Sequence, residues 1–141
     1  MLKKTLLATC LAASLLSLTA HAQVGQEQTF KSELGPVTAT TVAQGLDHPW
    51  ALAFLPGRQG MLITELAGNL RWVSPEGKVS APISGVPQVW AKGQGGLLDV
   101  VLSPDFANDR MVYLSFAEAG KDGKAGTAVG RGRLSDDLSK L

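Results

Sequence analysis

The sequence has few residues of the kinds that build metal and thiol sites. Its 141 residues include one cysteine, Cys10, and two histidines, His21 and His48. A single cysteine cannot form a disulfide within the chain. A structural zinc site takes four ligands, mostly from cysteine and histidine, so these three residues cannot supply one.

An excess of charge of one sign is also missing. Lysine and arginine number 13 and aspartate and glutamate 12, which leaves a formal net charge of +1 at pH 7. Such a balance provides no basic field to attract nucleic acid or an anionic membrane surface. We therefore expect no nucleic acid among the partners of this protein.

The first 22 residues have the three parts of a secretory signal peptide. A basic start, Met1–Lys4, precedes an apolar run over Leu6–Leu18, and Ala20–Ala22 fits the small-x-small cleavage pattern. The apolar run is short for a membrane span, which favours cleavage over the alternative of an uncleaved anchor. Cys10 lies inside this run, a position that argues against a lipoprotein. We predict a signal peptide over 1–22 and a periplasmic or secreted protein with no stable membrane anchor.

After the signal peptide, short apolar runs alternate with turn residues. Residues 23–36 are polar without a sustained period, and we expect a poorly ordered leader there. The continuous apolar run over 50–55, closed by Pro56-Gly57, predicts a buried strand. Similar runs bounded by turn residues predict further strands over 37–43, 61–65 and 69–73, with a short outer strand near 78–83.

A second copy of this pattern follows the glycine-rich segment Trp90–Gly96. Residues 97–102 form an apolar run that we expect to be buried on both faces. Val100–Pro104 match Leu52–Pro56 with an offset of 48, and Val112–Ser115 match Met61–Thr64 with an offset of 51. After a loop predicted over 118–126, a third strand is expected near 129–134.

The repeat predicts an all-β fold of the β-propeller type. No segment between the leader and Leu134 has a sustained helical period. Units of about fifty residues with three or four strands are typical of propeller blades. A closed propeller has about four to eight blades, so we expect residues 37–141 to be the first two blades of a longer protein. A small β-sandwich is the alternative.

Few residues are candidates for acid–base or metal chemistry. His48 stands between Asp47 and Pro49 in a turn, where bonding to the loop is the simpler interpretation than catalysis. Glu65 ends a strand, and we expect an exposed turn carboxylate there. Asp99 interrupts an apolar strand, so it should accept backbone hydrogen bonds or face a channel. Asp105 and Asp109 are turn residues, and they lack the dense spacing of oxygen ligands that a calcium loop has.

Gln94 is the candidate ligand contact. Its amide can donate to and accept from a hydroxyl group, which suits a sugar, and the glycines beside it permit close approach. The other glycine-rich segment, Gly126–Gly132, lacks the lysine and the following helix of a phosphate loop. The three tryptophans are expected to pack in the core or at the rim: Trp50, Trp72 and Trp90.

Several motifs, in order along the chain, resemble the glucose/sorbosone dehydrogenase family of soluble quinoproteins. They are Gly45–Pro56, Leu62–Glu65, Gly93–Asp99 and Ser103–Phe106. The late segments Gly123–Gly130 and Gly132–Asp137 look like the periplasmic aldose sugar dehydrogenase branch of that family. The resemblance covers about residues 37–141.

The resemblance implies a six-bladed β-propeller that binds pyrroloquinoline quinone (PQQ) and calcium and oxidises the C1 hydroxyl of aldose sugars to lactones. Hydride passes to the quinone, a histidine takes the proton, and a separate electron acceptor reoxidises the cofactor. Of the family's site residues, only the glutamine of Gly-Gln-Gly-Gly is carried over, onto Gln94. His48 does not match the catalytic histidine's motif. We expect the catalytic base and most cofactor and calcium ligands to lie beyond Leu141, and the 141-residue chain to be inactive.

Two other functions stay open. A propeller can be a non-enzymatic module that binds sugar or protein, because a fold does not determine function. A calcium-dependent sugar-lactone hydrolase on a similar propeller is the third possibility, but it needs convergent acidic ligands that this sequence does not show.

Overall fold

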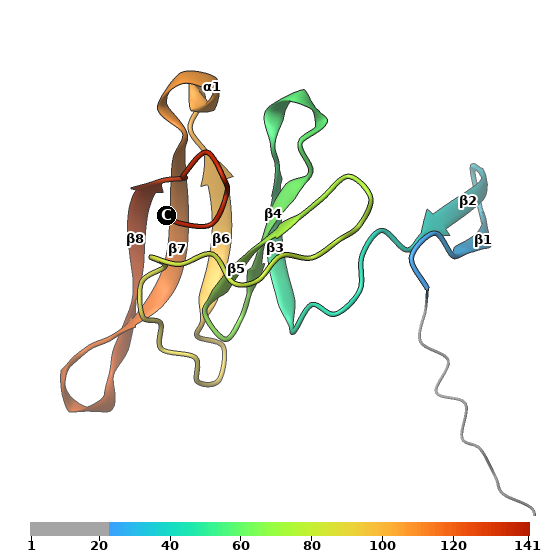
Figure 1. Cartoon of the computed structure of the whole chain (residues 1–141). Helices are drawn as coiled ribbons and strands as arrows, with labels where there is room; N and C mark the ends of the chain where they lie inside the picture. The colour runs from blue at the N-terminus through green and yellow to red at the C-terminus, as the bar shows by residue number, and fades with distance from the viewer. Residues whose placement is uncertain (1–22) are drawn as a thin grey trace, which may run out of the picture.

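The computed structural model describes residues 23–141, which form antiparallel sheets connected by turns (Figure 1). The predicted signal peptide, 1–22, lies outside the described residues. The sheets have the orders β1-β2, β3-β4-β5 and β6-β7-β8. The elements are β1 (Glu27–Ser32), β2 (Gly35–Thr40), β3 (Pro49–Phe54), β4 (Met61–Glu65), β5 (Asn69–Val73), β6 (Leu97–Leu102), α1 (Phe106–Asp109), β7 (Met111–Ala119) and β8 (Ala125–Arg133), with 3-10 turns at Pro56–Arg58 and Lys121–Gly123.

The expected leader is wrong in one respect, because part of it is a strand. β1 pairs with β2 in a hairpin that runs from Glu27↔Thr40 to Ser32↔Gly35. Residues 23–36 show no apolar alternation because the hairpin is exposed almost throughout and stands apart from the other sheets (Figure 1). Backbone pairing alone therefore defines this hairpin, and hydropathy could not reveal it. The strand predicted over 37–43 corresponds to β2 and ends earlier, at Thr40.

The two three-stranded sheets lie side by side and share one apolar core (Figure 1). Leu62 and Leu70 of the first sheet and Leu97 and Leu114 of the second are at most 1% exposed. The innermost strands of the two sheets, β3 and β6, contact each other. The core therefore lies between the sheets, as expected for two neighbouring blades.

Equivalent hydrogen bonds in the two sheets follow the internal repeat of the sequence. The first strand of each sheet shifts register once, and at each shift a hydroxyl replaces the missing backbone partner. The Ala51 N–H donates to Thr64 Oγ1 at 3.0 Å, and the Asp99 N–H donates to Ser115 Oγ at 3.0 Å. These two pairs are separated by 48 and 51 residues, the offsets found in the sequence.

The repeat extends into the turns that precede the first strands. The Leu66 N–H donates to the His48 carbonyl at 3.0 Å, and the Ala117 N–H donates to the Gly96 carbonyl at 2.8 Å. The same two offsets relate these residues. The turn that ends at His48 is therefore the structural counterpart of the glycine-rich turn that ends at Gly96.

The prediction that residues 50–55 are fully buried is wrong. Ala51 and Ala53 pack against the shared core, but Trp50, Leu52 and Phe54 are 53%, 51% and 71% exposed. Successive side chains of a strand point to opposite faces, and within residues 23–141 no sheet covers the second face of β3.

The first strand of the second sheet is also less buried than predicted. Residues 97–102 are not buried on both faces, because Asp99 and Val101 of β6 are exposed. Only one face of β6 packs against the shared core.

Two segments differ from the expected loop and outer strand. The loop predicted over 118–126 is shorter, because Glu118 pairs with Gly126 and Ala119 with Ala125 in a β7–β8 hairpin. The outer strand near 78–83 is reduced to an isolated bridge at Val79. Its ladder is interrupted because the Ser80 hydroxyl accepts from the Trp72 N–H and Pro82 has no N–H to donate.

Candidate functional site

Three turns gather at one end of the two sheets, the lower end in Figure 1. They are the turn before β3, the β4–β5 turn and the glycine-rich segment before β6. The last two turns meet at Gly96, where a Cβ would lie 2.2 Å from the Leu66 carbonyl oxygen, and the Leu97 N–H donates to that carbonyl at 3.1 Å. This end of the molecule contains every residue that sequence analysis linked to ligand binding.

Gln94 lies exposed in the glycine-rich turn. Gly93 and Gly96 have φ angles of +60° and +153°, which favour glycine. Among the described residues, the Gln94 amide makes no hydrogen bond, so both its donor and its acceptor are available to a ligand.

The remainder of the turn is anchored on both sides of Gln94. The Trp90 N–H donates to the Ala117 carbonyl at 2.7 Å, and the Gly95 N–H donates to the Lys92 carbonyl at 3.0 Å. The Lys92 ammonium lies 4.5 Å from the centre of the Trp90 ring, a cation–π contact. The turn therefore presents Gln94 from a defined backbone.

Glu65 is buried rather than exposed, which corrects the expectation of an exposed turn carboxylate. Its carboxylate accepts from the Asp47 N–H at 2.9 Å, from Asn69 Nδ2 at 2.9 Å and from Arg71 Nε at 3.0 Å. Burial raises the pKa of the Glu65 carboxyl, but the hydrogen bonds from Asp47, Arg71 and Asn69 outweigh it and hold the pKa below its ordinary value. Glu65 is thus an ionised anchor for the turn before β3. The hydropathy pattern does not reveal this role. The only possible signal in the sequence was Arg71, six residues later, as a partner for a buried carboxylate.

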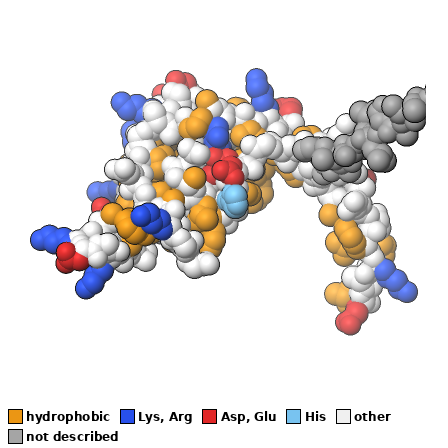
Figure 2. Space-filling model, turned by 90° about the horizontal axis from the view of Figure 1, so that it is seen from below, with side chains coloured by type: hydrophobic (Ala, Val, Ile, Leu, Met, Phe, Trp, Pro, Cys, Tyr) orange, Lys and Arg blue, Asp and Glu red, His pale blue; other side chains and the backbone are white. Residues whose placement is uncertain are grey.

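His48 extends from the turn that Glu65 anchors. Its Nδ1 lies 2.5 Å from Asp47 Oδ1, and its side chain is 79% exposed. Figure 2, seen from this end, shows the pale blue histidine side chain at the surface beside acidic and hydrophobic side chains. The bond to Asp47 agrees with the interpretation of His48 as a residue that bonds to its own turn.

A hollow of about 180 Å³ lies between the three turns. It is lined by His48, Leu66 and Ala67 from the first sheet's turns and by Ala91, Gly93 and Gly95 from the glycine-rich turn. Gln94 stands between two of these glycines. The arrangement places one imidazole and several apolar groups around a space open to solvent.

Several other candidates are structural. Asp99 is exposed and accepts a hydrogen bond from the Val100 N–H at 2.9 Å, as the sequence suggested. Trp72 donates from Nε1 to the Gln59 carbonyl at 2.7 Å, while Trp50 is exposed and does not pack in the core. The rejected phosphate-loop segment, Gly126–Gly132, lies within β8.

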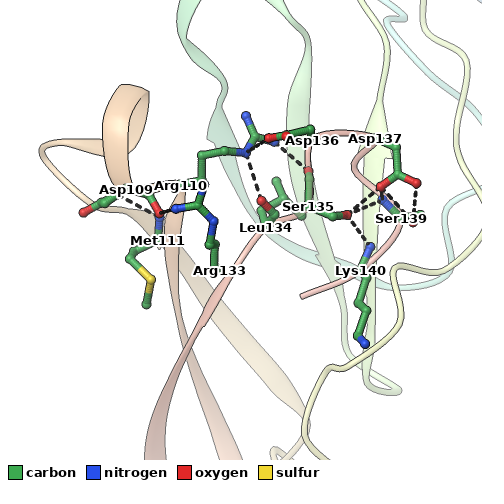
Figure 3. Close-up of polar contacts among 10 residues, drawn as sticks. All are labelled: Asp109, Arg110, Met111, Arg133, Leu134, Ser135, Asp136, Asp137, Ser139 and Lys140. Atoms are coloured by element: carbon green, nitrogen blue, oxygen red, sulfur yellow. Dashed lines mark hydrogen bonds and ion pairs between the residues drawn. The ribbon is translucent and has the colours of Figure 1, made fainter.

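The opposite end of the second sheet contains a separate polar network (Figure 3). Asp109 accepts from the Met111 N–H at 2.8 Å and from the Ser103 hydroxyl at 2.6 Å, which confirms it as a turn residue. These bonds, that from Met111 first, lower the pKa of the Asp109 carboxyl. Arg110 Nε and Nη2 donate to the Leu134 and Ser135 carbonyls at 2.9 and 2.7 Å. This network holds the chain after β8 in place.

Within residues 23–141, no three histidine, cysteine, aspartate or glutamate side chains cluster around a possible metal position. Calcium takes six to eight oxygen ligands, so the described residues do not fit a calcium site. Gln94 and the glycine backbone could provide only one edge of a quinone site. No reaction step can be derived through either group from this part of the chain.

No helix in the described part of the chain has the length and apolar character needed to cross a membrane.

Sequence comparison finds relatives among sugar dehydrogenases. The chain is 65% identical over 106 residues to the aldose sugar dehydrogenase YliI of Escherichia coli, covering 74% of this chain and 28% of that protein. It is 31% identical over 108 residues to quinoprotein glucose dehydrogenase B of Acinetobacter calcoaceticus, covering 74% and 23%. The chain thus spans less than a third of the length of these relatives.

Solved structures of similar proteins agree with the sequence matches. The apo-form of the soluble aldose sugar dehydrogenase from Escherichia coli superposes with a TM-score of 0.69 at 66% identity, over 71% of this chain and 29% of that one. The PQQ-bound aldose sugar dehydrogenase from Streptomyces coelicolor gives 0.57 at 29% identity, over 80% and 30%. A family model described as glucose/sorbosone dehydrogenase matches residues 46–141. Since this match covers both three-stranded sheets and the turns between them, the chain belongs to the glucose/sorbosone dehydrogenase family.

Proposed function

We propose that this chain is part of a periplasmic or secreted quinoprotein that oxidises the C1 hydroxyl of aldose sugars to lactones. The observation that carries the proposal is the 65% identity over 106 residues to an aldose sugar dehydrogenase. A PQQ-bound relative and a quinoprotein glucose dehydrogenase support the choice of cofactor. When PQQ is bound, it accepts the hydride from the sugar, and a separate acceptor takes the electrons onward.

The fold in this proposal is a six-bladed β-propeller, of which the two three-stranded sheets are consecutive blades. The hydrogen-bonded repeat supports this assignment, because two sheets with the same register shifts and end contacts are expected of successive blades. The exposed apolar face of β3 also supports it, since Trp50, Leu52 and Phe54 would pack against another blade.

Gln94 is the residue of this chain that we assign to the substrate and cofactor pocket. An exposed amide without a hydrogen-bond partner in residues 23–141 can donate to and accept from sugar hydroxyls. Its position at the end of the sheets where three turns gather is consistent with this role (Figure 1). We assign no catalytic residue and no calcium ligand to residues 23–141.

The proposal is tested with the complete protein, loaded with PQQ and calcium and assayed with aldoses and an artificial electron acceptor. Gln94→Ala should lower kcat/KM by about tenfold or more, the effect of losing one or two hydrogen bonds in the transition state. The matched control is Gln88→Ala, an exposed amide in the same connection between the sheets, which should leave kcat/KM unchanged. Absence of sugar oxidation by the loaded complete protein would overturn the proposal.

The 141-residue chain is the second arm of the test. It lacks a site for calcium among its described residues, so we expect no turnover with PQQ, calcium, glucose and an electron acceptor. Turnover by this chain would show that the catalytic base lies within it.

A further inference from the structure

The β1–β2 hairpin is a part of the described chain that the proposed function does not use. It lies outside residues 46–141, which the family model matches, and it stands apart from the two three-stranded sheets (Figure 1). Every residue of β1 is exposed. A two-stranded hairpin is at best marginally stable alone in water, and further strands are needed to stabilise it. The hairpin is therefore a candidate for pairing with another strand.

The outer edge of β1 has free backbone groups. In an antiparallel ladder, residues that bond to the partner strand alternate with residues whose N–H and C=O groups point away from it. The Thr41 N–H donates to the Gln26 carbonyl at 2.9 Å, so the even-numbered residues of β1 bond to β2, whereas Glu27, Thr29 and Lys31 direct their backbone groups outward. Within residues 23–141, no strand other than β2 pairs with β1. Every second residue of β1 therefore offers a donor and an acceptor to a further strand.

The outer edge of β2 is protected against such pairing. Its outward residues are those that face Lys31, Thr29 and Glu27 in the register, and the first of them is Pro36. Proline has no N–H to donate, and edge strands commonly use it to prevent pairing with another chain. β1 contains no proline. An additional strand is therefore expected beside β1 and not beside β2.

The charges of β1 are complementary to those of a second β1. If two copies of the strand run antiparallel with Thr29 facing Thr29, then Glu27 of each copy faces Lys31 of the other. The facing residues are all outward residues, so each facing pair can exchange both of its N–H···O=C hydrogen bonds. Opposite charges that face each other across two strands stabilise the pairing, and like charges destabilise it.

The apolar residues of the hairpin fit the same arrangement. Phe30 faces Val37 in the hairpin, and both are 54% exposed. In the paired strands Phe30 would be the diagonal neighbour of the second Phe30, a distance within reach of aromatic side chains. The two copies would then share one apolar row across four strands.

We propose that β1 is a dimerisation edge, through which two copies of this chain pair about a two-fold axis at Thr29 and form a four-stranded sheet of order β2-β1-β1-β2. A two-fold contact of this kind closes on two subunits, and Pro36 protects the outer edges from further growth. Because the contact is one strand wide, we expect a weak dimer with Kd on the order of micromolar. The inference goes beyond the proposed function and does not depend on sugar oxidation.

The dimer is tested by sedimentation velocity of the complete protein over roughly 1 to 200 μM, where the dimer fraction should rise with concentration. Lys31→Glu makes both Glu27 contacts repulsive, and Glu27→Lys does the same with two lysines. Each variant should raise Kd by about tenfold or more. An equal mixture of the two variants should form a heterodimer about as tight as the unmodified dimer, because every lysine then faces a glutamate.

A pair of proline variants tests which edge is used. Thr29 and Thr38 face each other and share one hydroxyl–hydroxyl bond of 3.1 Å, so Thr29→Pro and Thr38→Pro lose the same side-chain contact and each removes one outward N–H. Thr29→Pro should abolish the dimer, whereas Thr38→Pro, the matched control, should leave Kd within about twofold. Circular dichroism shows whether each variant keeps its fold, and the charge variants test the pairing without any change to the backbone.

Three results would overturn the dimerisation edge. They are a monomer throughout the concentration range, a Kd that neither charge variant changes, and equal effects of the two proline variants in folded protein. A monomer would mean that the edge of β1 is covered within one chain.

Discussion

Glu65 and Arg71 form an ion pair in which Oε2 lies 3.0 Å from Nε, with the glutamate side chain fully buried and that of the arginine 20% exposed. Glu65 also accepts hydrogen bonds from Asp47 and Asn69, so one carboxylate at the end of β4 connects the turn before β3 with β5. Its buried charge is compensated by three donors, one in that turn and two in β5. The pair is a structural anchor for the end of the first three-stranded sheet, where the candidate site lies.

Removing this carboxylate should destabilise the complete protein. Glu65→Ala leaves the Arg71 guanidinium and the Asp47 N–H without their partner, and breaking a buried pair in this way costs about 3–5 kcal/mol. Chemical denaturation measures the change in the free energy of unfolding. Glu118→Ala, at an exposed position near the end of β7, is the control and should change stability by less than about 0.5 kcal/mol. Equal effects of the two substitutions would contradict the anchoring role.

The same carboxylate predicts a loss of stability in acid. The pKa of Glu65 is held below its ordinary value of 4.5, so the unfolded chain binds the proton more readily than the folded one. Its contribution to stability is complete above about pH 4.5 and is lost as the pH falls through the pKa of the folded state. Glu65→Gln removes this titration.

Denaturation series at pH 7, 5, 4 and 3 should therefore show the stability advantage of the unmodified protein over Glu65→Gln shrinking below about pH 4.5. A difference that stays constant with pH would show that Glu65 does not titrate as inferred. Asp109 and Asp137, whose pKa values are also lowered by hydrogen bonds, are present in both proteins and cancel in the comparison.

Thr64 is expected to connect the two three-stranded sheets through its hydroxyl. Oγ1 accepts from the Ala51 N–H at 3.0 Å and donates to the Leu98 carbonyl of the neighbouring sheet at 2.6 Å, and the residue is fully buried. Thr64→Val keeps the shape but leaves two backbone groups unpaired, at a cost of about 1–3 kcal/mol in the free energy of unfolding. The exposed Thr38→Val, which loses a bond to Thr29, should cost far less. Equal costs in denaturation would contradict a connecting role for Thr64.

Gly96 should tolerate no side chain, whereas Gly93 should tolerate a small one. A Cβ at Gly96 would lie 2.2 Å from the Leu66 carbonyl oxygen, while a Cβ at Gly93 would meet no atom within 4 Å. Both have positive φ, so both substitutions to alanine include a backbone cost of about 1–2 kcal/mol. Gly96→Ala should therefore lower the thermal midpoint clearly more than Gly93→Ala, and equal shifts would contradict the close approach of the two turns.

The strands of the two three-stranded sheets could be predicted because their side chains alternate around a shared core. Buried apolar residues mark these strands in the sequence, for example Leu62 and Leu70 in the first sheet and Leu97 and Leu114 in the second. The sequence offsets of 48 and 51 residues also relate the hydrogen bond of Thr64 to that of Ser115. The β1–β2 hairpin could not be predicted in this way, because exposed strands have no apolar pattern.

The candidate site was predictable only in part. The glycines around Gln94 indicate a turn that can approach a ligand, and the structure places Gln94 in such a turn. The neighbourhood of His48, Leu66 and Ala91 could not be predicted, because these residues come from three turns that meet only when the sheets pack.

Local chemistry in the sequence by itself determined the all-β class, the repeated unit and the glycine-rich turn of Gln94, because alternation and turn residues act over a few positions. Only the tertiary structure decided that Glu65 is a buried, ionised anchor and that one face of β3 is exposed. Burial depends on which surfaces meet across the sheets. A carboxylate at the end of a strand is exposed or buried according to how the neighbouring segments pack around it, such as the turn that contains Asp47, 18 residues before Glu65.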